Sequence, residues 1–480
     1  MDDPKAKMAT DIPAAVLTPD SVETRLGTLR FFDGLPDEET VRTVYDNLDF
    51  QRGVQAYLAA LPAADMCALR EGYRAFGPDN RALLVTESLM DSKTLYFVAN
   101  TETPYSMAWL DTRDGPLVIE MPPEVLGFMS DFWSRFVTDV GAPGPDRGRG
   151  GKYLLLPPGH TGDVPDDHFV LRSRTYGNAI IFRGFMKDGD LRPALEATRA
   201  HYRVYRLDEA ADPPAVTFLD VSGKYMNCIP PSDASLFDLV ATVVHEEPLE
   251  AVDPETRGLL ASIGIRKDAP FAPDERMRAI LAEAAAVGNA TARAVLFSTR
   301  DPELYLYEDR SWKLNHKGDD AEFSPGGVLD LDVRTYYFSA TDQLSPAMWV
   351  KMVGAGSQYG VATQDGEGRY LDGGRTYRLH LPPDIPAKDF WSVLVYDTQT
   401  RSMLQTDQRF PSLSSQKSDL VVNADTSVDV WFGPEPQAGR ESNWIQTIPG
   451  KGWFTFLRLY GPLEPWFDMS WRPGEIELVD

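Results

Sequence analysis

The stretch Asp131-Phe132-Trp133-Ser134 decides how the chain is interpreted, because it returns as Asp389-Phe390-Trp391-Ser392. In both copies an aspartate stands five positions after the serine, at Asp139 and at Asp397. Internal similarity between two halves of a chain bears on how the whole chain is built. We therefore predict two related β-modules, and the space between them is the first place to look for a site.

The flanks of the two copies are also alike. An apolar run closed by a double proline precedes each copy, at Pro122-Pro123 and at Pro382-Pro383. An apolar run that ends in arginine follows each copy, at Arg183 and at Arg458. A structural role is the alternative to a role of these blocks in a site. The two tryptophans would then pack in a core, and the two aspartates would cap a turn or the start of a strand.

Composition limits the classes of partner. The 480 residues contain 72 Asp and Glu against 47 Lys and Arg, a formal net charge of −25. Phosphate backbones and anionic membrane surfaces attract Lys and Arg, so we expect neither nucleic acid nor membrane as a partner. We expect a small-molecule ligand, and self-association into a homo-oligomer stays open.

Cysteine and histidine are sparse. The two cysteines form no CxxC pattern, and no two of the six histidines have close metal-ligand spacing. We therefore predict no metal site and leave the cofactor unknown.

The first 15 residues lack an apolar stretch of signal-peptide length, and no run approaches the ~18 residues of a spanning helix. We expect a cytoplasmic protein, or a periplasmic one if an export signal was removed.

The chain divides by its local pattern into four parts. Residues 23–32 and 37–61 have a helical pattern that Pro62 should interrupt, while residues 82–121 alternate short β-branched runs with turns. The fold class predicted is mainly β with helical segments, with two antiparallel β-sandwiches joined by a helical domain. The predicted parts are a helical leader (1–80), an N-terminal β-sandwich (81–188), a helical domain (189–300) and a C-terminal β-sandwich (301–480).

A polar cluster in the first module is the first half of a candidate site. The segment from Asn100 to Tyr105 places hydrogen-bonding side chains between two apolar runs, just before Trp109. We take Glu102 as a candidate acid or base, with ligand-binding roles for Asn100, Thr103, Tyr105 and Trp109. The alternative is a turn in which Asn100 and Thr103 satisfy backbone groups.

Arginines in apolar surroundings supply the second half. A charge within or beside an apolar run is costly unless it is paired, and four arginines have this setting: Arg135, Arg183, Arg401 and Arg458. Asp139 or Asp397 could pair with them in structural ion pairs. Alternatively a guanidinium could fork onto a carboxylate or phosphate of a ligand. Tyr396 and Asp397, followed by Arg401, form the densest polar cluster of the second module.

Longer motifs resemble a family. The segment from Asn100 to Asp111, with Arg183-Gly184-Phe185, is similar to the N-terminal half of a widespread bacterial two-module family. The C-terminal half is similar through Asp389-Phe390-Trp391-Ser392, Thr400-Arg401-Ser402-Met403-Leu404, Trp431-Phe432-Gly433-Pro434 and Leu457-Arg458-Leu459-Tyr460-Gly461-Pro462. The two halves are domains of unknown function, numbered twelve-fifty-four and twelve-fourteen. The resemblance implies two β-sandwiches joined through a helical domain, the second of jelly-roll type, and it supplies no reaction.

Two functional hypotheses follow. The first is a small-molecule enzyme of hydrolase or lyase type with its site in the cleft between the modules. Glu102 or Asp397 would act as acid or base, and Arg401, Arg183 or Arg458 would stabilise an anion. The alternative is a non-catalytic protein that binds sugars or organic acids or takes part in an assembly. Its arginines would be structural, and exposed aromatics such as Trp466 and Trp471 would make the contacts.

Overall fold

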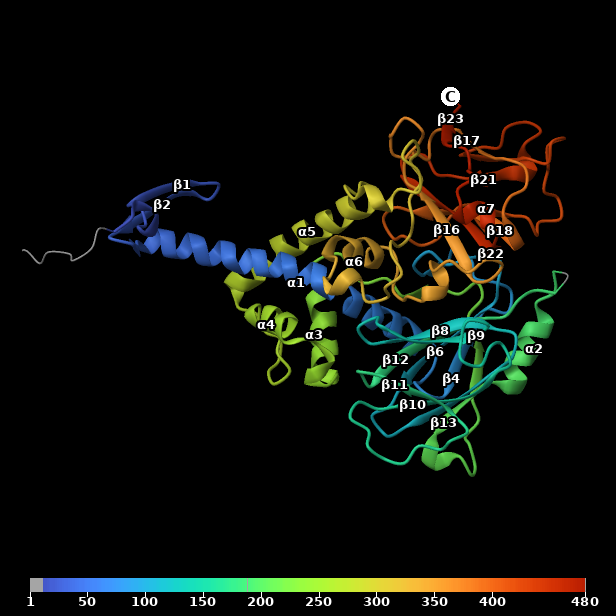
Figure 1. Ribbon diagram of the computed structural model, residues 1–480, viewed down its shortest axis with the longest axis horizontal. Coiled ribbons are helices and arrows are strands. Elements are labelled where there is room, and N and C mark those ends of the chain that lie inside the picture. The colour runs from blue at the N-terminus through green and yellow to red at the C-terminus, as the bar shows by residue number, and fades with distance from the viewer. Residues whose placement is uncertain (1–11, 188, 480) are drawn as a thin grey trace, which may run out of the picture.

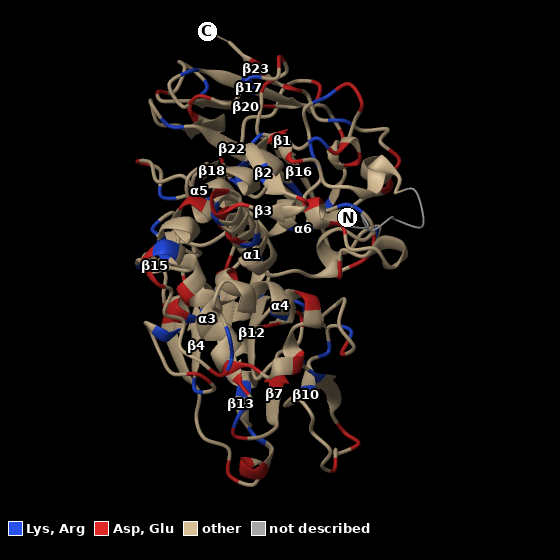
Figure 2. Ribbon diagram, turned by 90° about the vertical axis from the view of Figure 1, so that its left-hand side faces the viewer, with Lys and Arg blue, Asp and Glu red and all other residues tan. Residues whose placement is uncertain are grey.

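The computed structural model describes residues 12–187 and 189–479, and it has a mixed α and β fold. Two β-modules lie one above the other on one side of the molecule, and a layer of helices extends from their junction to the other side (Figure 1). Each module contains an outer sheet at its far end and an inner sheet that faces the middle of the molecule (Figure 2).

The N-terminal module has an inner sheet in the order β14-β4-β6-β12-β8-β9 and an outer sheet in the order β11-β10-β7-β13. Apolar side chains from both sheets, including Leu110, Ile119, Leu155 and Phe182, form one buried cluster between them. The strands are β4 (Ala82–Val85), β6 (Tyr105–Asp111), β7 (Leu117–Met121), β8 (Leu126–Asp131), β9 (Phe136–Gly141), β10 (Gly151–Leu156), β11 (Phe169–Arg172), β12 (Gly177–Arg183), β13 (Arg203–Arg206) and β14 (Thr217–Asp220).

The C-terminal module has an inner sheet in the order β16-β22-β18-β19 and an outer sheet in the order β21-β20-β17-β23. Its buried cluster includes Leu379, Val393, Val430 and Leu457, again from both sheets. The strands are β16 (Ser357–Ala362), β17 (Tyr377–Leu381), β18 (Ala387–Asp397), β19 (Ser412–Ser414), β20 (Val428–Gly433), β21 (Trp444–Gln446), β22 (Trp453–Pro462) and β23 (Ile476–Leu478).

The two modules repeat one strand order. The inner series β6-β12-β8-β9 corresponds to β16-β22-β18-β19, and the outer series β11-β10-β7-β13 corresponds to β21-β20-β17-β23. The double prolines stand at equivalent places, between β7 and β8 and between β17 and β18. The N-terminal module adds β4 and β14. The repeat in the sequence is therefore also a repeat in strand order.

The sequence pattern predicted that the strands pair antiparallel, but some pairs of strands are parallel. The pairs β10–β11 and β20–β21 are parallel at equivalent places, and β4–β14 is parallel as well. In each case a long connection separates the paired strands, so no tight turn imposes the antiparallel direction.

The repeated tetrapeptides occupy different local structures. Asp389-Phe390-Trp391-Ser392 lies within β18, and Trp391 packs between the sheets. In the first copy β8 ends at Asp131, and a turn with Ser134 at φ +59° follows. The Asp131 carboxylate stabilises this turn by accepting hydrogen bonds from the backbone N–H of Trp133 (2.8 Å) and Arg135 (3.0 Å).

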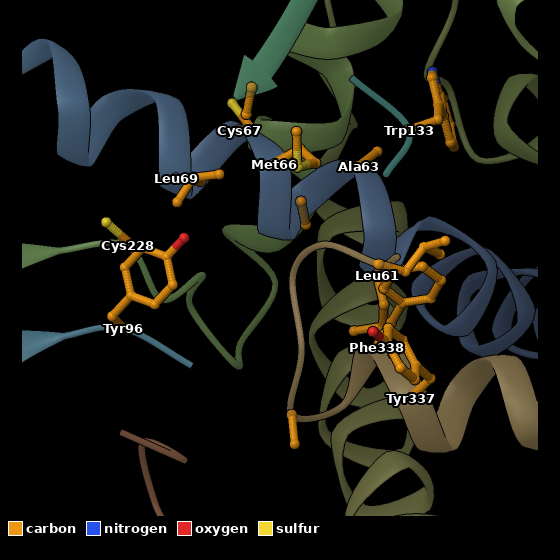
Figure 3. Packing of buried hydrophobic residues seen from close by; sticks show 14 of the residues in the cluster. Leu61, Ala63, Met66, Cys67, Leu69, Tyr96, Trp133, Cys228, Tyr337 and Phe338 are labelled. Carbon is orange, nitrogen blue, oxygen red and sulfur yellow. The ribbon is translucent and has the colours of Figure 1, made fainter. Parts of the chain in front are cut away.

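Helix α1 (Glu38–Arg74) is the centre of the helical layer, which also contains α3 (Leu236–Glu246), α4 (Pro254–Ser262), α5 (Glu275–Phe297) and α6 (Leu331–Phe338). Figure 3 shows Met66, Cys67 and Leu69 of α1 in this core, and Tyr337 and Phe338 of α6 beside Leu61. The expected helix break at Pro62 is wrong. Nearly every residue from 56 to 73 is buried, and this packing outweighs the local cost of proline.

Residues 23–32 were expected to be helical and instead belong to a small sheet of β1 (Ser21–Thr24), β2 (Gly27–Phe32) and β3 (Leu35–Pro36). Gly27 and Gly34 both have positive φ, which makes the reversals between strands that a helix would not allow. This sheet lies at the end of α1 that projects from the body (Figure 1).

The predicted domain boundaries stay a prediction, although some elements cross them. Strands β13 and β14 come from residues 189–300 and join the N-terminal sheets, while α6 comes from residues 301–480 and joins the helical layer. The remaining regular elements are β5 (Thr94–Leu95), β15 (Met226–Asn227), α2 (Arg192–His201) and α7 (Glu464–Phe467).

Helix α5 differs from the expectation that no segment could span a membrane. Among the described residues it is the one helix long and apolar enough to do so by length and composition. It packs along α1 in the structure, where Gly53 of α1 faces Ala284 and Gly288 of α5 faces Tyr57.

Candidate functional site

A cavity of about 660 Å³, counted with its opening to solvent, lies between the two inner sheets. Strands β6, β8 and β12 line it from the N-terminal module, and β16 and β22 line it from the C-terminal module. The segment after α6 supplies a further wall. The lining residues are Tyr96, Phe97, Val98, Tyr105, Phe128, Ile181, Arg183, Asn315, Tyr337, Thr341, Asp342, Gln343, Met348, Tyr359, Phe456 and Arg458.

Equivalent strands supply equivalent arginine–tyrosine pairs to this cavity. Arg183 of β12 is the cross-strand partner of Tyr105 on β6, and Arg458 of β22 is the cross-strand partner of Tyr359 on β16. Each guanidinium carbon lies over the ring of its partner, at 5.9 Å from the centroid in the first pair and 5.1 Å in the second. The two apolar runs that end in arginine therefore meet at one site.

Arg183 is buried without a polar partner. Its side chain is 8% exposed, and no described residue makes a hydrogen bond or ion pair with its guanidinium. The guanidinium stays protonated at any ordinary pH, and a buried charge is costly unless it is paired. Arg183 therefore presents its hydrogen-bond donors and its charge to the cavity.

Arg458 is held between the modules. Its Nη2 donates to the Tyr396 hydroxyl oxygen (2.7 Å) and to the backbone carbonyl oxygen of Val98. The Tyr396 hydroxyl donates in turn to the carbonyl oxygen of Ala99 at 2.7 Å, and burial raises its pKa. Nε of Arg458 is buried and has no partner in the described part of the chain. Arg458 thus joins the two modules through Nη2 and keeps Nε without a partner.

Asp342 is the carboxyl group of the cavity. Its side chain is 4% exposed, Oδ2 has no hydrogen-bond partner among the described residues, and burial raises its pKa to about 7. Sequence reasoning missed this residue. It follows α6 in a region predicted to be β-rich, and Thr341-Asp342-Gln343 has no motif that distinguishes it from a surface turn.

The polar cluster of the first module forms a turn beside the cavity. Oδ1 of Asn100 accepts from the backbone N–H of Glu102 (3.0 Å) and of Thr103 (3.1 Å), as the alternative interpretation of this segment expected. Oε1 of Glu102 accepts from the Thr101 hydroxyl at 2.6 Å, and burial raises the pKa of Glu102. Of these residues and Tyr105, only Tyr105 lines the cavity.

Asp397 and Arg401 lie away from the cavity lining. Asp397 accepts from Nζ of Lys451 (3.2 Å) and from the backbone of its own turn. Nε of Arg401 donates to the carbonyl oxygen of Ser339 (3.0 Å), and burial lowers its pKa to about 10. Arg401 borders a smaller cavity next to α1, together with Asp65.

The other predicted residues have structural contacts. Trp109 packs edge-on against Phe132, with 4.7 Å between ring centroids. Nε of Arg135 pairs with Asp131 at 2.8 Å, so the partners expected for it, Asp139 and Asp397, are wrong. Trp466 and Trp471, expected to be exposed, are buried against the core of the C-terminal module.

Within residues 12–187 and 189–479, no group of three His, Cys, Asp or Glu side chains lies where it could hold a metal ion.

Two family models match the chain. Residues 80–206 match a protein of unknown function (DUF1254), and residues 356–464 match a protein of unknown function (DUF1214). The chain carries both domains of the two-module family, in the expected order. The two matched ranges contain the strands that carry Arg183 and Arg458. No curated protein matches the chain.

Solved structures are similar in fold. The crystal structure of the VPA0106 protein from Vibrio parahaemolyticus has a TM-score of 0.53 at 18% identity, over 90% of this chain and 100% of that chain. An uncharacterised protein from Burkholderia cenocepacia has a TM-score of 0.40 at 13% identity, over 91% of this chain and 96% of that chain. The similarity to the Vibrio parahaemolyticus protein supports the arrangement of the fold and says nothing about function.

Proposed function

We propose that the chain is a small-molecule enzyme, of hydrolase or lyase type, whose cavity between the modules binds an organic acid or another small organic anion. The observation that carries the proposal is the buried guanidinium of Arg183, which faces the cavity without a partner in the described chain. We also infer that the two sheets of each module form a β-sandwich, of jelly-roll type in the second module.

The donors at the cavity suit an anion. Arg183 offers its whole guanidinium and Arg458 offers Nε, and none of these groups can accept a hydrogen bond. A carboxylate accepts two parallel N–H donors from one guanidinium, a geometry that lysine cannot reproduce. Apolar walls from Phe128, Ile181 and Phe456 would contact the body of the ligand.

Asp342 supplies the candidate acid or base. A carboxyl group with a pKa of about 7 exchanges a proton readily near neutral pH, which suits general acid–base catalysis. Among the described lining residues there is no serine, cysteine or histidine to form an activated nucleophile. Proton transfer by Asp342 would serve a lyase, or a hydrolase that activates water directly.

A non-catalytic binding protein is the second candidate. The observation that favours it is the engagement of Arg458 with Tyr396 and Val98, which leaves one guanidinium free for a ligand. Such a protein would bind the same organic acid through Arg183 and release it unchanged.

The test combines ligand stabilisation with product detection. Organic acids and their esters are screened by thermal shift against the wild type, Arg183→Met and Asp342→Asn, because a ligand of the folded state raises its apparent stability. Arg369→Met is the control, since Arg369 is half exposed, pairs with Asp365 and does not line the cavity. We expect an acid to raise the Tm of all variants except Arg183→Met. Equal shifts in Arg183→Met would contradict the site.

Turnover separates the two candidates. Each stabilising compound is incubated with the wild type and with Asp342→Asn, and products are followed by NMR. The enzyme proposal expects products from the wild type and none from Asp342→Asn, although both bind. Binding without product for every stabilising compound would favour the non-catalytic protein.

A further inference from the structure

A second pair of cavities lies at the edge of the helical layer, apart from the cavity between the modules. One has a volume of about 1000 Å³ and the other about 1170 Å³, each counted with its opening to solvent. Trp133 and Val252 line both cavities, so the two adjoin at these residues. Trp133 belongs to the same buried cluster as Met66 of α1, and Figure 3 shows it set apart from the labelled side chains of α1.

The first of these cavities has an apolar wall. Its surface is built mainly from apolar residues at the end of α3, in α4 and in the segment that follows α4, among them Val244, Leu249, Leu260, Ala261 and Ile265. Four charged residues also border it, and Nε of one of them, Arg257, is buried without a partner in the described part of the chain; the other three are Arg266, Lys267 and Asp268. The carboxylate of Glu247 also borders it but is engaged, because it accepts from the backbone N–H of Tyr176 and of Gly177 (3.0 Å). The wall therefore suits a hydrocarbon group.

The second cavity has hydrogen-bond donors that lack acceptors. Nη2 of Arg135, Nε of Arg334 and Nε1 of Trp133 are buried, and none has a partner in the described part of the chain. Arg135 uses Nε on Asp131 (2.8 Å) and Nη1 on the carbonyl oxygen of Ala251 (2.7 Å), which leaves Nη2. A buried donor without an acceptor is costly.

The acidic residues around the second cavity make no hydrogen bond with these three donors. Oδ1 of Asp253 caps α4 by accepting from the backbone N–H of Glu255 and Thr256, both at 3.0 Å, and the charge of Asp253 favours the protonated form of Arg334 without a hydrogen bond to it. Glu322 lies 3.6 Å from Arg174 in an exposed ion pair. Glu250 is exposed. The three free donors therefore call for acceptors from outside, and Arg and Trp donors select a ligand that accepts only.

We propose that these adjoining cavities bind an amphiphilic anion, with its carboxylate or sulfate group on Arg135, Arg334 and Trp133 and its hydrocarbon chain in the apolar cavity. Trp133 stands at the junction, where its ring contacts the chain and its N–H faces the head group. Trp391, its counterpart in the repeated tetrapeptide, packs between the sheets of the C-terminal module instead. The first copy of the repeat thus borders the proposed site at the edge of the helical core, whereas the second lies within the core of the C-terminal module.

The test uses a homologous series of n-alkyl carboxylates, from butanoate to decanoate, titrated by calorimetry into the full chain carrying Arg183→Met. This background silences the cavity between the modules, so the second site is measured alone. We expect Kd to fall by about fourfold for each added methylene until the apolar cavity is full. n-Alkyl sulfates should bind similarly, and n-alkyltrimethylammonium ions should not bind.

Variants of the chain assign the two parts of the site. Arg334→Met should weaken every member of the series at least tenfold, and Trp133→Phe should weaken every member by a similar factor while it keeps the ring. Ala261→Phe should remove the dependence on chain length and leave butanoate unaffected. Arg300→Met is the control, because Arg300 is exposed and pairs with Asp332 (2.9 Å).

Three outcomes would overturn this proposal. They are a Kd independent of chain length, equal binding of the alkylammonium ions, and unchanged binding in both Arg334→Met and Trp133→Phe. Circular dichroism establishes that each variant is folded, and the two head-group variants keep the test decisive if one of them does not fold.

Discussion

At the scale of single residues, Arg183 and Arg458 hold equivalent places in the two modules but differ in their partners. Replacing Arg183 by Met removes a buried charge that makes no hydrogen bond or ion pair with a described residue. We expect the free energy of unfolding to rise by about 1–3 kcal/mol, because well-packed apolar groups outperform unpaired buried charges. Urea denaturation measures the change.

Arg458→Met is the matched control for this prediction. It removes hydrogen bonds to the Tyr396 hydroxyl and to the Val98 carbonyl oxygen, so we expect a loss of about 1–3 kcal/mol. A loss of stability in both variants would contradict the assignment of Arg183 as a free guanidinium kept for a ligand.

Asp342 gives a prediction on pH. Burial raises its pKa from 3.8 to about 7, so between these values the folded chain keeps a proton that the unfolded chain has released. Its contribution to stability is present at low pH and is lost as pH rises from about 4 to 7. The free energy of unfolding of the wild type minus that of Asp342→Asn should therefore decrease across this range.

The slope of this decrease is at most about 1.4 kcal/mol per pH unit. Urea denaturation of both proteins at pH 5, 6, 7 and 8 measures it, and the difference should become constant above about pH 7. Asp139 and Glu247 also have raised pKa values but are present in both proteins, so their contributions cancel. A difference that does not change with pH would rule out a raised pKa for Asp342.

The residues of the candidate site were only partly predictable. Arg183, Arg458 and Tyr105 could be singled out because charge or hydroxyl groups beside apolar runs are expected to be buried. Glu102 was singled out by the same kind of pattern, yet it stabilises a turn, because local hydrogen bonds compete for such residues. Asp342 could not be found, since only the tertiary fold brings the segment after α6 to the cavity.

At the scale of elements, the contact between α1 and α5 depends on glycines. A Cβ added at Gly288 would lie 2.7 Å from the ring of Tyr57 on α1. We expect Gly288→Ala to destabilise the chain by about 1–3 kcal/mol through overpacking, although alanine is the better helix former. Thermal unfolding measures the effect.

Gly258 of α4 is the matched control, since a Cβ there would meet nothing within 4 Å. Gly258→Ala should stabilise the chain by up to about 1 kcal/mol, which is the ordinary difference in helix propensity. Stabilisation by both substitutions would contradict the close packing of α1 on α5.

Elements were predictable where one local signal dominates. The strands around Arg183 and Arg458 follow from β-branched and aromatic runs bounded by turns. The course of α1 through Pro62 was not predictable, because the burial of its second half depends on helices and strands distant in the sequence. The prediction of antiparallel pairing was wrong at the parallel pairs for a similar reason. When a long connection joins two strands, the whole sheet sets their relative direction.

At the scale of the whole molecule, a repeated module explains the position of the site. Each module turns its inner sheet to the middle of the molecule, and a central strand of each inner sheet carries an arginine, Arg183 at the end of β12 and Arg458 within β22. The repeated sequence blocks predicted two related modules and a site between them. They did not predict the helical layer that closes the cavity with Asp342, because the segment after α6 belongs to neither copy of the repeat.

The central claim is that Arg183 holds the anionic group of a small organic ligand between the modules. Crystals of the wild type soaked with a bromine-labelled organic acid selected by the thermal-shift screen test it directly, because anomalous scattering locates the bromine. We predict a carboxylate within hydrogen-bonding distance of the Arg183 guanidinium, about 2.7–3.0 Å, with bromine in the same cavity. Bromine found elsewhere, with Arg183 paired to a carboxylate of the protein itself, would contradict the claim.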